Sequence, residues 1–259
     1  MFLLGLAVGS FLNVLIFRLP LEESFIRGRS RCPDCRHNLS WKDLFPLISF
    51  LVLKRKCRYC FKKISWRYFG VELLSGLIFL AFFWVTKPVG LFLFWPFLFW
   101  LAVLSLLIVL LFIDFDYLII PDKILLVLGL LAFLYHWLTT DGFSNIFSNF
   151  LVGTVSGLIF FLIFAITRGY YREGGMGLGD VKLVALLGFT FGWPAILLII
   201  YLALGSGLIW SVVLLLWFGG KSDTKLPFGS LLAGSAIIFV LFNKFFMPNL
   251  WPYIVRFYL

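Results

Sequence analysis

Long apolar segments separated by short polar loops constrain the fold of this chain more than any other feature. Of its 259 residues, 62% are hydrophobic and 13% are charged, and the mean hydropathy is +1.05. An ordinary soluble domain carries about a quarter charged residues, whereas a membrane-spanning helix needs roughly 20 apolar ones. The composition therefore predicts an all-α polytopic membrane protein.

Eight apolar segments are expected to be transmembrane helices. The motif Gly192-Trp193-Pro194 separates the sixth from the seventh, because proline ends or kinks a helix. The first segment lacks a basic stretch before it and a small-residue cleavage site, so we expect it to remain as a helix rather than to be removed as a signal peptide. No internal repeat is evident. The segments cover residues 1–19, 71–85, 91–113, 122–138, 146–167, 181–191, 195–219 and 228–246.

Basic residues are concentrated in the polar stretch that follows the first segment. The chain has 22 Lys and Arg and a net charge of +10, and thirteen of these residues lie between Arg18 and Arg67. With eight spans, nineteen fall on the side of this loop and three on the other, and the basic side of a membrane protein is cytoplasmic. A basic loop also suits an anionic lipid surface, so the lipid bilayer is expected as a partner and nucleic acid is not.

All four cysteines lie in this basic loop, as two Cys-x2-Cys pairs separated by twenty-one residues. That spacing is typical of a zinc ribbon, and a reducing compartment disfavours disulfides. The loop is too small for a good hydrophobic core and needs a staple. We predict a structural Zn²⁺ bound by four thiolates, which leave no open position for catalysis; the alternative is free or redox-active thiols. The predicted ligands are Cys32, Cys35, Cys57 and Cys60.

Four aspartates border the apolar segments: Asp114, Asp116, Asp122 and Asp180. Carboxylates are expensive near a bilayer core and are usually functional or sheltered there. Asp180 has a structural alternative as a helix N-cap, and Asp122 has one as an acid favoured by a helix dipole. Asp114 ends an apolar helix, where a negative charge opposes the dipole, so a functional role is favoured.

Glycine supplies four of the six residues 174–179, immediately before Asp180. A backbone without Cβ atoms, as at Gly177 and Gly179, lets a peptide lie close to the carboxylate. A phosphate-binding loop is disfavoured because the Gly-Lys-Ser/Thr ending is missing and an acid at the helix start repels anions. Two facing carboxylates can share a proton and hydrolyse a peptide bond. No Ser-His or His-metal set competes, since the chain has only two histidines.

In this order, the motifs resemble those of the type IV prepilin peptidases, the leader peptidase/N-methyltransferases of pilus and type II secretion systems. The resemblance runs nearly from end to end. Besides the two Cys-x2-Cys pairs, it rests on Gly9-Ser10-Phe11-Leu12-Asn13-Val14, Arg18-Leu19-Pro20, Pro46-Leu47-Ile48-Ser49, Arg67-Tyr68, Val71-Glu72-Leu73, Asp114-x-Asp116-x4-Pro121-Asp122, Gly177-x-Gly179-Asp180 and Pro227-Phe228-Gly229.

The resemblance implies that Asp114 and Asp180 are the catalytic aspartates and that the four cysteines bind zinc. It also implies removal of a short basic leader from prepilins or pseudopilins, after a glycine, at the cytoplasmic face of the bacterial inner membrane. Methylation of the new N-terminal residue from S-adenosylmethionine is implied as well. Asp116, Asp122, Gly177 and Gly179 are expected to support the site.

The chain departs from the family pattern at three places. Phe69 and Ser230 stand where the family often has proline, and Lys54-Arg55-Lys56 stands where it often has a glycine. We expect a transmembrane helix over 1–19, a methyltransferase-associated zinc domain over 20–70, a second helix and turn over 71–90, and a peptidase domain over 91–259.

Three alternatives stay open from the residues. The chain could be a peptidase without methyltransferase activity, a transporter with acids near the bilayer midplane, or a non-catalytic pilin-assembly factor. The gathering of the acids at one predicted face weighs against transport. No Rossmann signature indicates where S-adenosylmethionine binds, so its site is unknown, with Glu72 and Arg18 as the only candidates.

Overall fold

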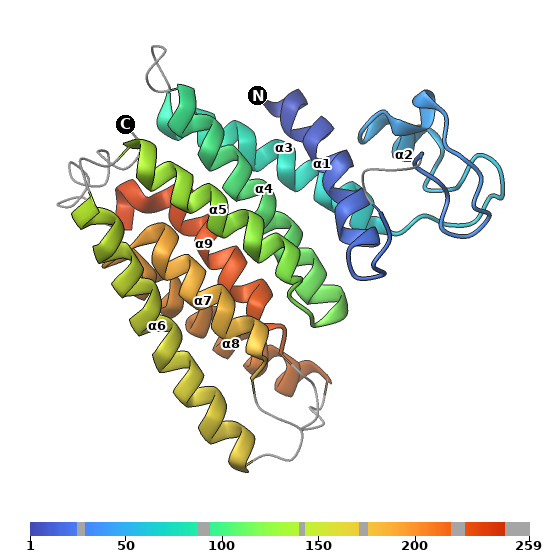
Figure 1. Cartoon of the computed structure of the whole chain (residues 1–259). Helices are drawn as coiled ribbons and strands as arrows, with labels where there is room; N and C mark the ends of the chain where they lie inside the picture. The colour runs from blue at the N-terminus through green and yellow to red at the C-terminus, as the bar shows by residue number, and fades with distance from the viewer. Residues whose placement is uncertain (25–28, 88–93, 140–142, 171–175, 219–225, 247–259) are drawn as a thin grey trace. The chain divides into compact units, whose positions relative to one another are not determined.

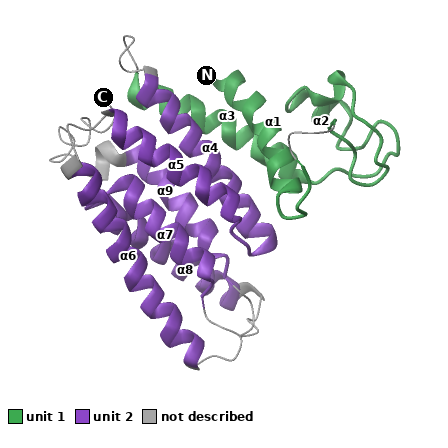
Figure 2. Ribbon diagram, in the orientation of Figure 1, with its two compact units in different colours: residues 1–88 green, residues 89–259 purple. Residues whose placement is uncertain are grey.

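A computed structural model describes the chain except for residues 25–28, 88–93, 140–142, 171–175, 219–225 and 247–259 (Figure 1). The described part is helical, with no β-strand and two isolated β-bridges, which confirms the predicted all-α class. The chain divides into two compact units, unit 1 from Met1 to Pro88 and unit 2 from Val89 to Leu259 (Figure 2).

Unit 1 is built on a pair of helices, α1 (Phe2–Arg18) and α3 (Trp66–Thr86), that pack against each other. Small residues allow a close approach: a Cβ added at Gly9 would lie 2.9 Å from the Cα of Glu72. The buried Asn13 donates from Nδ2 to the carbonyl of Tyr68 at 3.1 Å. The helix α3 begins five residues before the predicted start at Val71, because the Ser65 hydroxyl caps it by accepting from a backbone N–H.

The polar loop between these helices contains two short elements that the apolar pattern does not predict. They are the 3-10 turn η1 (Trp41–Leu44) and the helix α2 (Ile48–Val52), which contact each other. The ring of Phe50 is buried and lies 5.3 Å from the rings of both Trp66 and Phe69. One face of α2 is therefore fixed on the first turn of α3.

Unit 2 contains, in its described residues, α4 (Phe94–Tyr117), α5 (Asp122–Thr139), α6 (Phe143–Tyr170), α7 (Leu178–Phe191), α8 (Ala195–Phe218) and α9 (Phe228–Phe246). The short α7 contacts α5, α6, α8 and α9, while α4 packs on α5 and α9 (Figure 1). Glycines bring α6 and α7 closest together: a Cβ at Gly188 would lie 2.5 Å from the Ser156 hydroxyl oxygen. The helix that carries Asp180 is thus enclosed by its neighbours.

The predicted break at 192–194 is confirmed. Gly192 ends α7 with φ of +66°, and a Cβ there would lie 2.5 Å from Oδ1 of the buried Asn149. Glycine suits this position because it adopts positive φ readily and has no Cβ that would clash with Asn149. With 14 residues, α7 is about 21 Å long, which is shorter than the hydrocarbon core of about 30 Å.

Four of the described helices are long and apolar enough to cross a membrane: Trp66–Thr86, Trp95–Tyr117, Asn145–Gly169 and Ala195–Leu216. Two apolar helices, Phe2–Arg18 and Phe228–Phe242, are shorter. These helices confirm the prediction of a membrane protein, whereas the topology of eight spans stays a prediction. Several sequence features lie outside the described residues: Gly174 and Gly175, most of the predicted turn at 87–90, and the polar loop from 220 to 225.

Candidate functional site

Asp114 lies in the last turn of α4, which continues to Tyr117, four residues beyond the predicted end of that segment at Ile113. Only 5% of the residue is exposed. Its Oδ2 accepts from the N–H of Ser230 at 2.6 Å and is 3.0 Å from the Ser230 hydroxyl. Ser230 is in the first turn of α9, and a helix N-terminus favours an anion. The charge that opposes the dipole of α4 is therefore compensated by α9.

The Ser230 hydroxyl has two acceptors within reach. Its Oγ lies 2.8 Å from the carbonyl of Leu111 and 3.0 Å from Asp114 Oδ2, but a hydroxyl carries a single proton. The hydroxyl can donate to Asp114 when the Asp114 carboxylate is ionised, and to the Leu111 carbonyl when that carboxylate is protonated. Sequence reasoning singled out Ser230 only as a family departure; its place directly after Pro227-Phe228-Gly229 was the available signal.

Asp180 lies in the first turn of α7, so its predicted alternative as an N-cap is wrong. Gly177 is the N-cap, and its N–H donates to Asp180 Oδ2 at 3.2 Å. Asp180 is half-buried and lies within electrostatic range of the negative charge of Asp114. Folding has therefore brought together two carboxylates that are 66 positions apart.

Ile120 packs against two glycines, one beside each aspartate. A Cβ added at Gly179 would lie 3.0 Å from Cβ of Ile120, and one at Gly229 would lie 2.7 Å from its Cδ1. The Gly229 Cβ would also lie 3.1 Å from Asp114 Oδ2. Gly179 and Gly229 thus allow Ile120 to pack closely beside the acids. A Cβ at the exposed Gly177 would meet only Asp180 Oδ2, at 3.3 Å, and a backbone nitrogen, at 3.9 Å.

Asp116 and Asp122 are exposed, unlike Asp114. Asp122 begins α5, and its Oδ1 lies 2.7 Å from Nζ of Lys182 on α7. Both side chains are more than half exposed, and an exposed ion pair contributes little to stability. Residues two apart on a helix face different directions, so Asp116 does not share the face of Asp114.

The four cysteines are free thiols, and their sulfurs all lie within 4.8 Å of one another. The Cys32 and Cys60 sulfurs are 4.0 Å apart. Tetrahedral thiolate coordination at 2.3 Å places sulfurs about 3.8 Å apart, so this cluster fits a zinc ion. Burial raises the pKa of the Cys57 thiol, but hydrogen bonds from the N–H groups of Cys60 and Tyr59 and from the Cys32 and Cys60 side chains together lower this pKa to about 7.

Each cysteine pair sits in its own turn, and the two turns have the same backbone hydrogen bonding. The N–H of Cys32 donates to His37, and that of Cys57 donates to Lys62, five residues on in each case. An isolated bridge closes each turn, and φ is positive four residues after the first cysteine, at Arg36 and Phe61.

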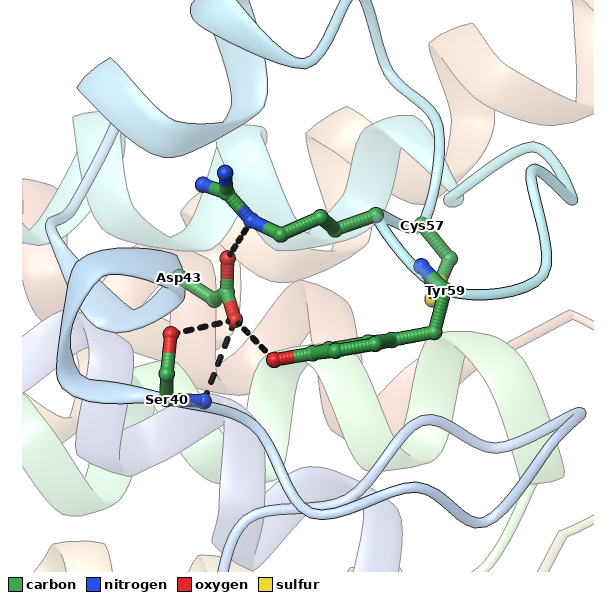
Figure 3. Close-up of polar contacts among 5 residues, drawn as sticks. Ser40, Asp43, Cys57 and Tyr59 are labelled. Carbon is green, nitrogen blue, oxygen red and sulfur yellow. Dashed lines mark hydrogen bonds and ion pairs between the residues drawn. The ribbon is translucent and has the colours of Figure 1, made fainter.

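Asp43 connects the second turn to the segment between the two turns (Figure 3). Its carboxylate accepts from the N–H and hydroxyl of Ser40, from Arg58 Nε at 2.7 Å and from the Tyr59 hydroxyl at 3.3 Å. Burial raises the pKa of Asp43, but the hydrogen bonds from Ser40 and Arg58 dominate and lower it. The N–H of Tyr59 in turn lies 3.5 Å from the Cys57 sulfur, so Asp43 supports a predicted ligand.

The two candidates for the cofactor site make contacts within unit 1. Glu72 Oε2 accepts the N–H of Leu47 at 2.9 Å. Arg18 is buried and donates to the carbonyls of Ser24 and Arg29, both at 2.9 Å. These contacts order the polar loop and give no separate indication of a bound cofactor.

Two family models match the chain: the bacterial peptidase A24 N-terminal domain over residues 3–86 and the type IV leader peptidase family over residues 101–212. A prepilin leader peptidase/N-methyltransferase of Bacillus subtilis is 32% identical over 94% of this chain and 93% of its own length. The chain belongs to the type IV leader peptidase family. A homologue of the same name from Pectobacterium carotovorum is 34% identical over 93% of this chain and 92% of its own length.

A third member with that name, from Myxococcus xanthus, is 39% identical over 85% of this chain, but the chain spans only 63% of its length. No solved structure matches the chain.

Proposed function

We propose that this chain removes the short basic leader of prepilins or pseudopilins after a glycine and methylates the new N-terminal residue. The proposal is supported by one observation above all: Asp114 of α4 and Asp180 of α7 lie within electrostatic range of each other. The names of the relatives support the substrate class. The positive-inside charge pattern supports a cytoplasmic location of the site at the bacterial inner membrane.

In the proposed mechanism the two aspartates share one proton. The ionised partner activates a water molecule, and the protonated partner polarises the scissile carbonyl and later protonates the amine. Because both Ser230 donors engage Oδ2 of Asp114, we assign its Oδ1 to the reaction. Asp116 and Asp122 are supporting acids in this proposal, and the exposed Gly177 lies where a peptide backbone can approach Asp180.

The proposed zinc site consists of the four cysteines and stabilises the domain over 20–70, which we associate with methylation. S-adenosylmethionine supplies the methyl group, and its binding residues are not assigned. Residues 91–259 form the proposed peptidase domain. The hydrogen bonds that Asp114 accepts from Ser230 and Asp180 accepts from Gly177 come from residues of unit 2, which supports this division.

The test is to incubate purified, detergent-solubilised protein with a prepilin, with and without S-adenosylmethionine, and to weigh the product by mass spectrometry. Loss of the leader together with one methyl mass supports both activities. Loss of the leader alone identifies a peptidase without methylation. An intact cognate substrate, with a well-folded enzyme, contradicts the proposal and favours a non-catalytic assembly factor.

A further inference from the structure

The segment from Trp41 to Val52, here called the η1–α2 face, exposes apolar side chains although it lies in the polar loop. Six of its twelve residues are large, apolar and between 41% and 71% exposed. Such a concentration is unusual on a surface that meets only water. The six are Trp41, Leu44, Phe45, Ile48, Leu51 and Val52.

Contacts within unit 1 hold this face beside the first turns of a helix that can cross the membrane. Phe50, on the other side of α2, packs on Trp66 and Phe69 of α3. The N–H of Leu47, at the start of α2, donates to Glu72, six residues into α3. Six residues of helix correspond to about 9 Å. The start of α2 is thus fixed beside the second turn of a candidate span rather than beyond its end.

Cations border the η1–α2 face. Lys42, Lys54, Lys56 and Arg58 are exposed, and Arg55 lies over the ring of Trp66 at 5.4 Å. Against these five cations the segment 41–58 contains one acid, Asp43, which already pairs with Arg58. Lys42 lies over the ring of Trp41 at 5.6 Å. Exposed tryptophan with flanking lysine and arginine is the composition found at membrane–water interfaces.

We propose that the η1–α2 face docks into the anionic leaflet of the membrane that α3 crosses, with its apolar side chains at the level of the headgroups and upper acyl chains. The position of the η1–α2 face beside the second turn of α3, its exposed apolar side chains and the cations that border it all favour this partner. The docking fixes the cysteine cluster at the membrane surface, because only four residues separate Val52 from Cys57. The proposal does not depend on the catalytic assignment.

The test uses the full chain in lipid nanodiscs made with anionic lipid brominated near the top of the acyl chains. Bromine quenches only tryptophan that enters the bilayer, and acrylamide quenches tryptophan that remains in water. The contribution of Trp41 is the difference between wild type and Trp41→Phe. A second reporter, Leu51→Trp in the Trp41→Phe background, reads α2 directly. The matched control is Asn38→Trp in that background, an exposed position in the first cysteine turn.

We expect the reporters at 41 and 51 to be quenched by brominated lipid and the reporter at 38 by acrylamide alone. Replacing Lys54 and Lys56 by glutamine should lower the ratio of docked to undocked face by about fivefold per cation. Quenching of residues 41 and 51 by acrylamide alone overturns the proposal. Protection from both quenchers also overturns it, since the face is then covered by protein.

Discussion

The two units hold their polar groups by opposite means. In unit 1, each pair of cysteines lies in a turn closed by hydrogen bonds between residues only a few positions apart. In unit 2, Asp114 receives its donors from Ser230, 116 positions further along the chain. A site made of local turns can be recognised from the spacing of its residues in the sequence, and it depends mainly on residues nearby in the chain. A buried carboxylate depends on helix packing, so small changes far away in sequence reach it.

The largest expected effect breaks the chemistry of unit 2 alone. Asp114→Asn and Asp180→Asn should each lower leader cleavage by about a thousandfold or more, because acid–base exchange between the carboxylates is lost. Asparagine retains the shape of the side chain, so membrane insertion should be unchanged. Cleavage is measured by mass spectrometry, and methylation of an already cleaved pilin peptide should persist. Full cleavage by either variant would show that the pair is not catalytic.

The second prediction breaks unit 1 alone. Cys57→Ser should abolish the proposed zinc binding, because a tetrahedral thiolate site needs all four ligands. The zinc content should fall from about one ion per chain to near zero. Limited proteolysis should then cut within the polar loop, while the helices of unit 2 stay intact. Methylation should be lost and cleavage reduced by a smaller factor. An unchanged zinc content would remove Cys57 from the ligand set.

The third prediction tests the long-range support of Asp114. Ser230→Ala removes the hydroxyl but retains the backbone N–H, and a hydrogen bond to a charged group is worth about 1.5–3 kcal/mol. We expect kcat for cleavage to fall by about tenfold with KM unchanged. Ser230→Thr, which keeps the hydroxyl, should restore the rate. If threonine is as slow as alanine, volume rather than the hydroxyl is what matters at this position.

The fourth prediction asks whether local support in unit 1 is equally specific. Asp43→Asn weakens the contacts to Arg58 and Tyr59, so zinc release to a chelator should be about tenfold faster. Asp34→Asn is the matched control. Asp34 also pairs with a basic residue of the second turn, Lys62, but both side chains are well exposed, and such a pair contributes little. Equal release rates in the two variants would argue against a special role of Asp43.

The smallest expected effect concerns backbone strain after α2. Lys54 and Arg55 both have positive φ, +48° and +62°, where the family often has a glycine. A non-glycine residue there costs about 1–2 kcal/mol, so Lys54→Gly should stabilise unit 1 by about 1 kcal/mol. The measurement is thermal unfolding in detergent, in which the midpoint temperature is read from proteolytic cleavage within the cysteine loop. Lys42→Gly, where φ is not positive, should lower stability instead.

The predicted helices of unit 2 match the observed ones closely, because apolar length and a Gly-Trp-Pro break are local signals. The structural alternative of Asp180 as an N-cap does not hold, since Gly177, three positions earlier, takes that place. The glycines near the aspartates were expected to admit substrate. That expectation stays a prediction. The structure adds that Gly179 packs against Ile120, a contact that no motif in either segment predicts.

By itself, the sequence determined the helical membrane class and predicted the cluster of four cysteines, because hydropathy and spacing act over short distances. Its motifs singled out the two acids, whose catalytic role stays a prediction. Only the tertiary structure decided that the N-terminus of α9 faces Asp114, that Ile120 lies between Gly179 and Gly229, and that α2 is fixed beside α3. Each of these depends on which helix packs against which, and the side chains that meet there are far apart in the chain.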